Sequence, residues 1–173
     1  IWRDVWMEVV PEGYIRSLIW SWDIENAQVT CDIECAGLPA ATGSRNAIEA
    51  SMTLDLAGET LAASMVRVHS DQLRLVAQIP ALANRQEWGR LLWSPAHPNL
   101  INARICVGED EIVSYVGIRD IHLSHRYLEI NHQPTYLRGI LDQGYWPSSY
   151  FTAPSPEALR ADLELARDMG FNF

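Results

Sequence analysis

The chain has 173 residues, of which 48% are hydrophobic and 20% are charged, and its formal net charge is −9. This composition is typical of a globular protein, and no apolar run approaches the roughly 18 residues that a membrane-spanning helix needs. Twenty-two acidic residues against 13 basic ones would repel a phosphate backbone. We therefore expect neither nucleic acid nor a membrane as a partner.

Three cysteines are too few for a disulfide scaffold. Cys31 and Cys35 are four residues apart in a segment that reads as a strand, so their Cα atoms would be about 13 Å apart, too far for a disulfide. Buried reduced thiols are favoured over a redox site. These features indicate a cytoplasmic protein, although a strand-like beginning in place of a signal peptide leaves secretion open.

Alternating apolar and polar residues, the period-2 pattern of half-buried strands, dominate the first 140 residues. The pattern is cleanest in "IEASMTLDL", where Ile48, Ala50, Met52, Leu54 and Leu56 share one face. Turn-forming residues separate the segments at a spacing of roughly ten residues. After a strand-like opening, "IWRDVWMEVV", the predicted strands are 28–35, 48–56, 60–68, 72–79, 99–107, 111–123 and 127–130.

This series of short strands, without intervening helices, predicts an all-β fold. We expect an immunoglobulin-like antiparallel β-sandwich over residues 13–134. The cysteine and tryptophan spacing of antibody domains is absent, so the prediction concerns the architecture alone.

The pattern changes after residue 134. "SPEALRADLELARDMG" predicts a helix with Ser155 as N-cap, Pro156 at its first position and Gly170 as its stop. A strand at 137–141, a loop, this helix and the apolar "FNF" make a β-α-β unit, which belongs to a parallel sheet or an α/β barrel. Residues 135–173 are therefore expected to be the truncated start of a second domain.

Five segments, taken together and in order, resemble glycoside hydrolase family 2, the family of β-galactosidases, β-glucuronidases and β-mannosidases. The segments are "IWRDVWMEVVP", "LLWSPAHPNLI", "YVGIRDIHL", "LEINHQPTYLRG" and "LRADLELARDMGFNF". The resemblance implies that residues 1–12 are the last strand of an N-terminal sugar-binding jelly roll. It also implies that residues 135–173 begin a catalytic TIM barrel.

The resemblance further implies a retaining glycosidase mechanism with two glutamates and no cofactor. Both glutamates are expected beyond Phe173, because a barrel takes about 250 residues and only 35 follow Arg138. We expect no catalytic residue and no metal site in this chain. A carbohydrate substrate and the neighbouring jelly-roll and barrel domains are the expected partners of the parent protein.

The segment "LRGILDQGYWP" departs from the family pattern. Residues 141–144, "LDQG", replace the Asn-x-His-Glu of galactosidase-like members, which disfavours β-galactosidase specificity. A loop after the first barrel strand would face the substrate. We therefore predict substrate contacts for Gln143, Tyr145 and Trp146, with a purely structural cover of the barrel rim as an equal alternative.

His132 stands where the family's hairpin has glycine. Either it adopts a positive φ, which favours Asn or Gly, or the turn is of another type. His122 and His125 are three apart on a predicted strand and so face opposite sides, which argues against a metal site made of these two. His69 and His97 are expected to be ordinary surface residues, as is His132.

Two carboxylate pairs, Glu109 with Glu111 and Asp162 with Glu164, read as solvated surface groups rather than as catalysts. Several tryptophans could stack on sugars, but filling domain interfaces is favoured over that role. They are Trp2, Trp6, Trp20, Trp22, Trp88 and Trp93.

The leading hypothesis is a non-catalytic sandwich fragment of a retaining β-glycosidase. The isolated chain is expected to be inactive. Its unpaired strand edges and apolar faces are expected to cause either self-association or refolding of the tail onto the sandwich. The alternative is a free-standing carbohydrate-binding or adhesion module without enzymatic activity.

Overall fold

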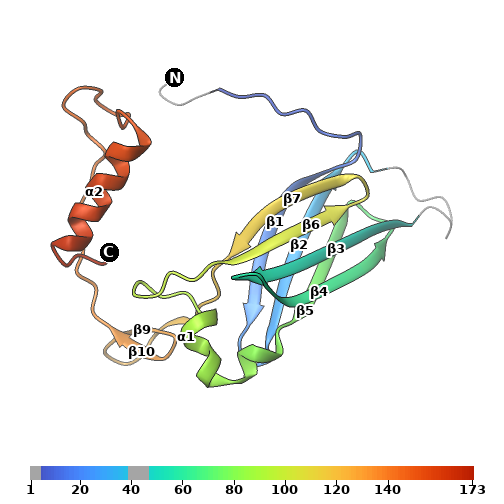
Figure 1. Ribbon diagram of the computed structural model, residues 1–173, viewed down its shortest axis with the longest axis horizontal. Coiled ribbons are helices and arrows are strands. Elements are labelled where there is room, and N and C mark those ends of the chain that lie inside the picture. Colours follow the sequence, from blue (N-terminus) through green and yellow to red (C-terminus); the bar gives the residue numbers. More distant parts are fainter. Residues whose placement is uncertain (1–4, 39–46) are drawn as a thin grey trace. The chain divides into compact units, whose positions relative to one another are not determined.

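The computed structural model describes residues 5–38 and 47–173. They form two compact units (Figure 1). One comprises residues 9–120, and the other comprises residues 121–173 together with residues 5–8. Within the described ranges, no helix is both long and apolar enough to cross a membrane.

The unit of residues 9–120 is built from two antiparallel sheets. The three-stranded sheet has the order β1-β2-β5, and the four-stranded sheet has the order β4-β3-β6-β7. The strands are β1 (Tyr14–Asp23), β2 (Gln28–Ala36), β3 (Ile48–Leu56), β4 (Glu59–Val68), β5 (Gln72–Gln78), β6 (Ile101–Val107) and β7 (Asp110–Val116). The predicted antiparallel β-sandwich is confirmed.

The alternation seen in the sequence places one face of each central strand in the core. Ala50, Met52 and Leu54 of β3 are fully buried, and they pair in register with Val107, Ile105 and Ala103 of β6. β2 and β5 contribute the opposite wall of the same core. Its buried members are Val29, Cys31, Ile33, Cys35, Leu73, Leu75 and Ala77. Apolar surface buried at about 25 cal/mol per Å² is the main stabilising contribution here.

The connection between β5 and β6 corrects the expectation of a region without helices. It contains two 3-10 turns, Pro80–Ala83 and Arg85–Glu87, and a short helix α1 (Trp88–Leu91). The Asn84 side chain accepts a hydrogen bond from the backbone N–H of Gln86 and caps the second turn. Leu82 and Leu91 are buried against the sandwich core. The alternating pattern of strands does not predict these two buried leucines, because they lie too far apart in the sequence.

The predicted strand 111–123 is interrupted at residues 117–120. Ile118 is fully buried, and its carbonyl accepts a hydrogen bond from the backbone N–H of Trp93 at 2.7 Å. A Cβ at Gly117 would lie 3.4 Å from the Trp93 side chain. The backbone here leaves β6 and pairs with Trp93 instead, so the strand divides into β7 and β8 (Ile121–Leu123).

The second unit contains a small antiparallel sheet of β8, β9 (Leu128–Ile130) and β10 (Gln133–Thr135). Asn131 and His132 join β9 to β10, with φ values of +53° and +62°. Two consecutive positive φ values in a two-residue loop define a type I′ hairpin turn. His132 therefore adopts the left-handed conformation that glycine would adopt at lower cost.

Helix α2 (Pro156–Asp168) confirms the predicted start and stop signals. The Ser155 hydroxyl accepts a hydrogen bond from the N–H of Ala158. At the other end, Gly170 has a φ of +89°, and the N–H groups of Gly170 and Phe171 donate to the carbonyls of Arg167 and Ala166. This pair of bonds is the Schellman motif that commonly ends a helix at glycine.

The predicted first strand is not formed within the described residues. Residues 5–11 have no strand structure, and residues 1–4 lie outside the described ranges. A strand forms only beside a neighbouring strand that pairs with its backbone N–H and C=O groups. Whether this segment becomes a strand therefore depends on its partner and not on its own sequence.

Two glycines with positive φ differ in the space around them and so predict different costs of substitution. A Cβ on Gly37 (φ +70°) would lie 1.9 Å from the Glu12 carbonyl oxygen, whereas one on Gly58 (φ +86°) would meet nothing within 4 Å. We expect Gly58→Ala to cost about 1–2 kcal/mol of unfolding free energy and Gly37→Ala to cost more than twice as much. Urea unfolding followed by circular dichroism measures both, and equal losses would contradict the predicted clash.

Candidate functional site

The candidate site is the loop that follows residues 136–141, and it is held at its base by the end of the chain's last helix. The backbone N–H of Arg138 donates to the Asn172 side-chain oxygen at 2.7 Å, and the N–H of Asn172 donates back to the Arg138 carbonyl at 3.0 Å. The N–H of Ile140 donates to the Phe173 carbonyl. The two segments thus run in the same direction, as neighbouring strands of a β-α-β unit do.

The predicted strand at 137–141 is not formed, because these residues belong to no sheet and no helix. Two backbone hydrogen bonds to residues 172 and 173 do not make a ladder. Arg138 adds a side-chain bond from its Nε to the Gly170 carbonyl at 2.6 Å. A Cβ on Gly139 would lie 3.1 Å from the Phe173 ring, so glycine allows this close approach.

The loop itself has a defined internal structure. The Asp142 carboxylate accepts a hydrogen bond from the N–H of Gly144 at 2.7 Å, and Gly144 has a φ of +69°. Trp146 and Tyr150 exchange two backbone hydrogen bonds of 2.8 and 2.9 Å. These bonds close a tight turn over residues 147–149.

This turn gathers aromatic side chains on the loop. The Tyr145 and Phe151 rings are tilted against each other, with their centroids 4.8 Å apart. Tyr145, Tyr150 and Phe151 are 63%, 73% and 63% exposed, and Trp146 is half-buried. Exposed aromatic faces beside polar groups can stack on a sugar ring while amides or carboxylates bind its hydroxyls.

The three predicted contact residues therefore lie on one loop but differ in exposure. Gln143 and Tyr145 are exposed, whereas Trp146 is partly covered. The sequence analysis did not single out Tyr150 and Phe151, which the turn returns to the same loop. The "PSSYF" segment indicates this turn, because a proline and two serines before paired aromatic residues favour a turn.

Two of the sandwich tryptophans have a structural role that the sequence did not reveal. The guanidinium carbon of Arg119 lies 5.7 Å from the ring centroid of Trp22 and 5.3 Å from that of Trp93. The Trp22 indole N–H also donates to the Arg119 carbonyl at 2.7 Å. Cation–π contacts of this kind contribute about 0.5–2 kcal/mol each. These contacts tie residues 117–120 to the sandwich.

The other predicted tryptophans divide between the core and the surface. Trp20 and Trp88 are partly buried against the core, and Trp88 donates to the Leu82 carbonyl at 2.8 Å. Trp6 is exposed and donates to Glu8. Trp2 lies outside the described residues.

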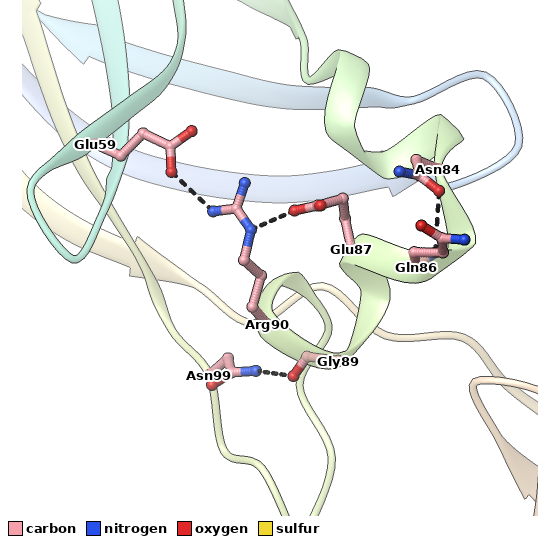
Figure 2. A network of polar contacts seen from close by, with 7 residues as sticks. All are labelled: Glu59, Asn84, Gln86, Glu87, Gly89, Arg90 and Asn99. Carbon is pink, nitrogen blue, oxygen red and sulfur yellow. Dashed lines mark hydrogen bonds and ion pairs between the residues drawn. The ribbon is translucent and has the colours of Figure 1, made fainter.

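A polar network surrounds α1 (Figure 2). Arg90 donates from Nη1 to Glu59 at 2.9 Å and from Nε to Glu87, and Asn99 donates to the Gly89 carbonyl at 3.0 Å. The ion-paired side chains are substantially exposed, so each pair contributes little stability on its own. The network links α1 to the start of β4 and has no nucleophile or acid–base pair.

The carboxylates weighed for catalysis are on the surface. Glu111 pairs with Arg104 across β6 and β7, and Glu109 lies in the turn before it. Asp162 and Glu164 are exposed on α2. All four side chains are exposed, whereas a general acid in a glycosidase lies in a substrate pocket.

The structure brings together a pair of histidines that sequence spacing did not suggest. His122 lies next to His132, with ring centroids 5.7 Å apart, and its Nε2 lies 3.1 Å from Glu129 Oε2. His125 lies in the turn between β8 and β9. Hairpin pairing therefore selects a partner ten residues away.

Solved structures of β-glucuronidase from Ruminococcus gnavus are similar to this chain. The complex with C6-substituted uronic isofagomine has a TM-score of 0.66, and the complex with D-glucuronic acid has the same score. Each is 17% identical to this chain and matches 94% of it. A further crystal structure of the enzyme is 18% identical, with a TM-score of 0.63.

This chain spans only about a quarter of the length of those structures, 25% and 26% in the two complexes. A scan against protein-family models found no match, and a search of curated proteins found none either. At this level of identity the likeness establishes the fold. The chain has the fold of one part of a glycosidase.

The three thiols should differ in reactivity. Cys31 and Cys35 are buried, and burial raises the pKa of the Cys31 thiol to about 12 and raises that of Cys35 as well. Cys106 is only partly buried. We expect Ellman's reagent to modify one thiol quickly in the native chain and all three in urea. Cys106→Ser should remove the fast phase, and persistence of that phase would contradict the assignment.

Proposed function

We propose that this chain is a non-catalytic part of a retaining glycoside hydrolase of family 2. The match of 94% of the chain to about a quarter of a β-glucuronidase is the observation that carries the proposal. In the parent protein, residues 1–12 would be the last jelly-roll strand, residues 13–134 would hold the sandwich followed by the small sheet of β8, β9 and β10, and residues 135–173 would begin the barrel.

The sandwich acts through packing. Its core is complete without help from residues 121–173, which suits a domain that holds others in place. By contrast, Leu159, Leu163 and Met169 of the α2 segment remain exposed. An apolar helix face of this kind needs a covering layer. Further barrel strands and helices supply that layer in the parent, and self-association supplies it in the isolated chain.

The loop of residues 142–151 forms one wall of the sugar site. Its position after the first β segment of a β-α-β unit supports this, because such loops form the active-site mouth of a TIM barrel. Tyr145 and Trp146 would stack on the sugar, and Gln143 would bind a hydroxyl group. Phe151 supports Tyr145 through their ring contact.

The hydrolytic chemistry itself comes from residues outside this sequence. A retaining glycosidase needs two carboxyl groups about 5–5.5 Å apart, one nucleophile and one acid–base. The surface positions of Glu109, Glu111, Asp162 and Glu164 argue against all four as catalysts. The chain accordingly contributes substrate positioning and domain packing.

The proposal predicts a difference in activity between the 173-residue chain and the longest natural product of its gene. Both are assayed against p-nitrophenyl β-D-glucuronide, β-D-galactoside and β-D-mannoside. We expect turnover by the longer protein only. Turnover by the 173-residue chain, or none by a full-length product too short to close a barrel, would overturn the proposal.

The loop contacts are tested in that longer protein. Tyr145→Ala and Trp146→Ala should each lower kcat/KM roughly 3- to 10-fold, the value of a lost aromatic contact of about 0.5–1.5 kcal/mol. Tyr115→Ala is the matched control, since Tyr115 is an exposed tyrosine on β7 of the sandwich. Unchanged kinetics in both loop variants would instead assign the loop to covering the barrel rim.

A free-standing carbohydrate-binding or adhesion module is the second candidate. The three exposed aromatic side chains of the loop favour it, because such a surface binds sugars without catalysis. A full-length gene product without glycosidase activity, together with glycan binding that Tyr145→Ala abolishes, would select this candidate.

A further inference from the structure

The sheet of β8, β9 and β10 places two imidazoles and a carboxylate close together. His122 of β8 pairs in register with Glu129 of β9, and His132 lies in the turn that leaves β9. All three come from one continuous stretch of eleven residues, and none belongs to the loop of residues 142–151.

The separation of the two rings suits a shared metal ion. Ring nitrogens of His122 and His132 lie within 4.8 Å of each other, and the ring centroids are 5.7 Å apart. Two imidazoles bound to one tetrahedral ion at about 2.0–2.1 Å have ring centres roughly 5–5.5 Å apart. A small side-chain rotation closes that difference.

Glu129 orients one of the two ligands. Its Oε2 lies 3.1 Å from His122 Nε2, so an Nε2–H donor directs the Nδ1 lone pair of the same ring away from the carboxylate. A carboxylate that fixes the tautomer of a ligating histidine in this way is the usual support of metal-bound imidazole. The His122 side chain is 42% exposed, which leaves room for an ion and its water ligands.

The backbone at His132 adds an independent indication. A φ of +62° costs a histidine about 1–2 kcal/mol that glycine would not incur. A side chain held in an unfavourable backbone conformation indicates that the side chain itself has a use.

We propose that His122 and His132, supported by Glu129, bind a divalent transition-metal ion such as Zn²⁺. The ion bridges β8 and the β9–β10 turn and takes water at its remaining positions. Strands of three residues are too short to be stable alone, so the ion acts as a clip on this sheet. The site is independent of the proposed glycosidase function and of its sugar contacts.

The test is isothermal titration calorimetry of ZnCl₂ into the EDTA-treated 173-residue chain at pH 7.5. We expect one zinc ion per chain. In NMR spectra of the ¹⁵N-labelled chain, zinc should shift the imidazole signals of His122 and His132 and leave those of His69, His97 and His125 unchanged. Absence of zinc binding, or shifts confined to the other three histidines, would overturn the proposal.

Matched histidine variants separate loss of a ligand from loss of the fold. His132→Asn removes the ring but suits a positive φ, so the turn should persist while zinc affinity falls at least 10-fold. His125→Asn makes the same change at the exposed histidine of the neighbouring turn and should bind zinc as the unchanged chain does. His132→Gly is the second variant, since glycine is the residue this turn prefers. Unaltered zinc affinity in both His132 variants would overturn the assignment.

Discussion

Met52, Leu54 and Ile105 are fully buried between two sheets whose inward faces consist almost entirely of apolar side chains. Every other feature of residues 9–120 is positioned by that burial. The cross-strand register of β3 with β6 and of β2 with β5 brings apolar side chains opposite one another. A slip of one residue would turn the whole apolar set outward, so the core fixes the pairing. The outward-facing ion pairs, such as Arg74 with Asp32, then add little.

The two units differ in how completely they bury their apolar side chains. The sandwich encloses its own core, and the Arg119 contacts with Trp22 and Trp93 fix the segment where it ends. The segment of residues 136–173 has a well-capped helix but leaves the apolar face of that helix exposed. Local signals are sufficient to form a helix there, whereas a barrel closes only when all its strands are present. This contrast supports the proposal that the sandwich acts as a connector and that the last residues belong to a larger domain.

The likeness to β-glucuronidase at 17% identity illustrates how little of a sequence a sandwich requires. Cores tolerate extensive exchange of apolar side chains when total volume and pattern are kept. Substrate specificity does not tolerate such exchange, because it depends on individual side chains in loops. The residues at 141–144 and the aromatic side chains of the same loop are therefore where this chain would differ from its structural neighbours in function.

The sequence alone predicted β2 to β7 of the sandwich, their core faces and both ends of α2, whereas β1 was not among the predicted strands. These follow from period-2 alternation, N-capping by Ser155 and the left-handed Gly170, all of which are local. It also predicted substrate contacts in the 142–147 loop from the position of this loop after a predicted strand, and this stays a prediction. The resemblance that pointed to a glycosidase rested on short motifs spread along the chain.

Only the tertiary structure decided which distant residues meet. The helical connection at residues 80–91 depends on Leu82 and Leu91 reaching the core, and the break after β7 depends on Trp93. Tyr145 contacts Phe151 because a turn reverses the loop, and His122 contacts His132 because a hairpin pairs β8 with β9. Sequence periodicity states which face a side chain occupies. It does not state which other face it will meet, because that depends on turns and packing between segments far apart in the chain.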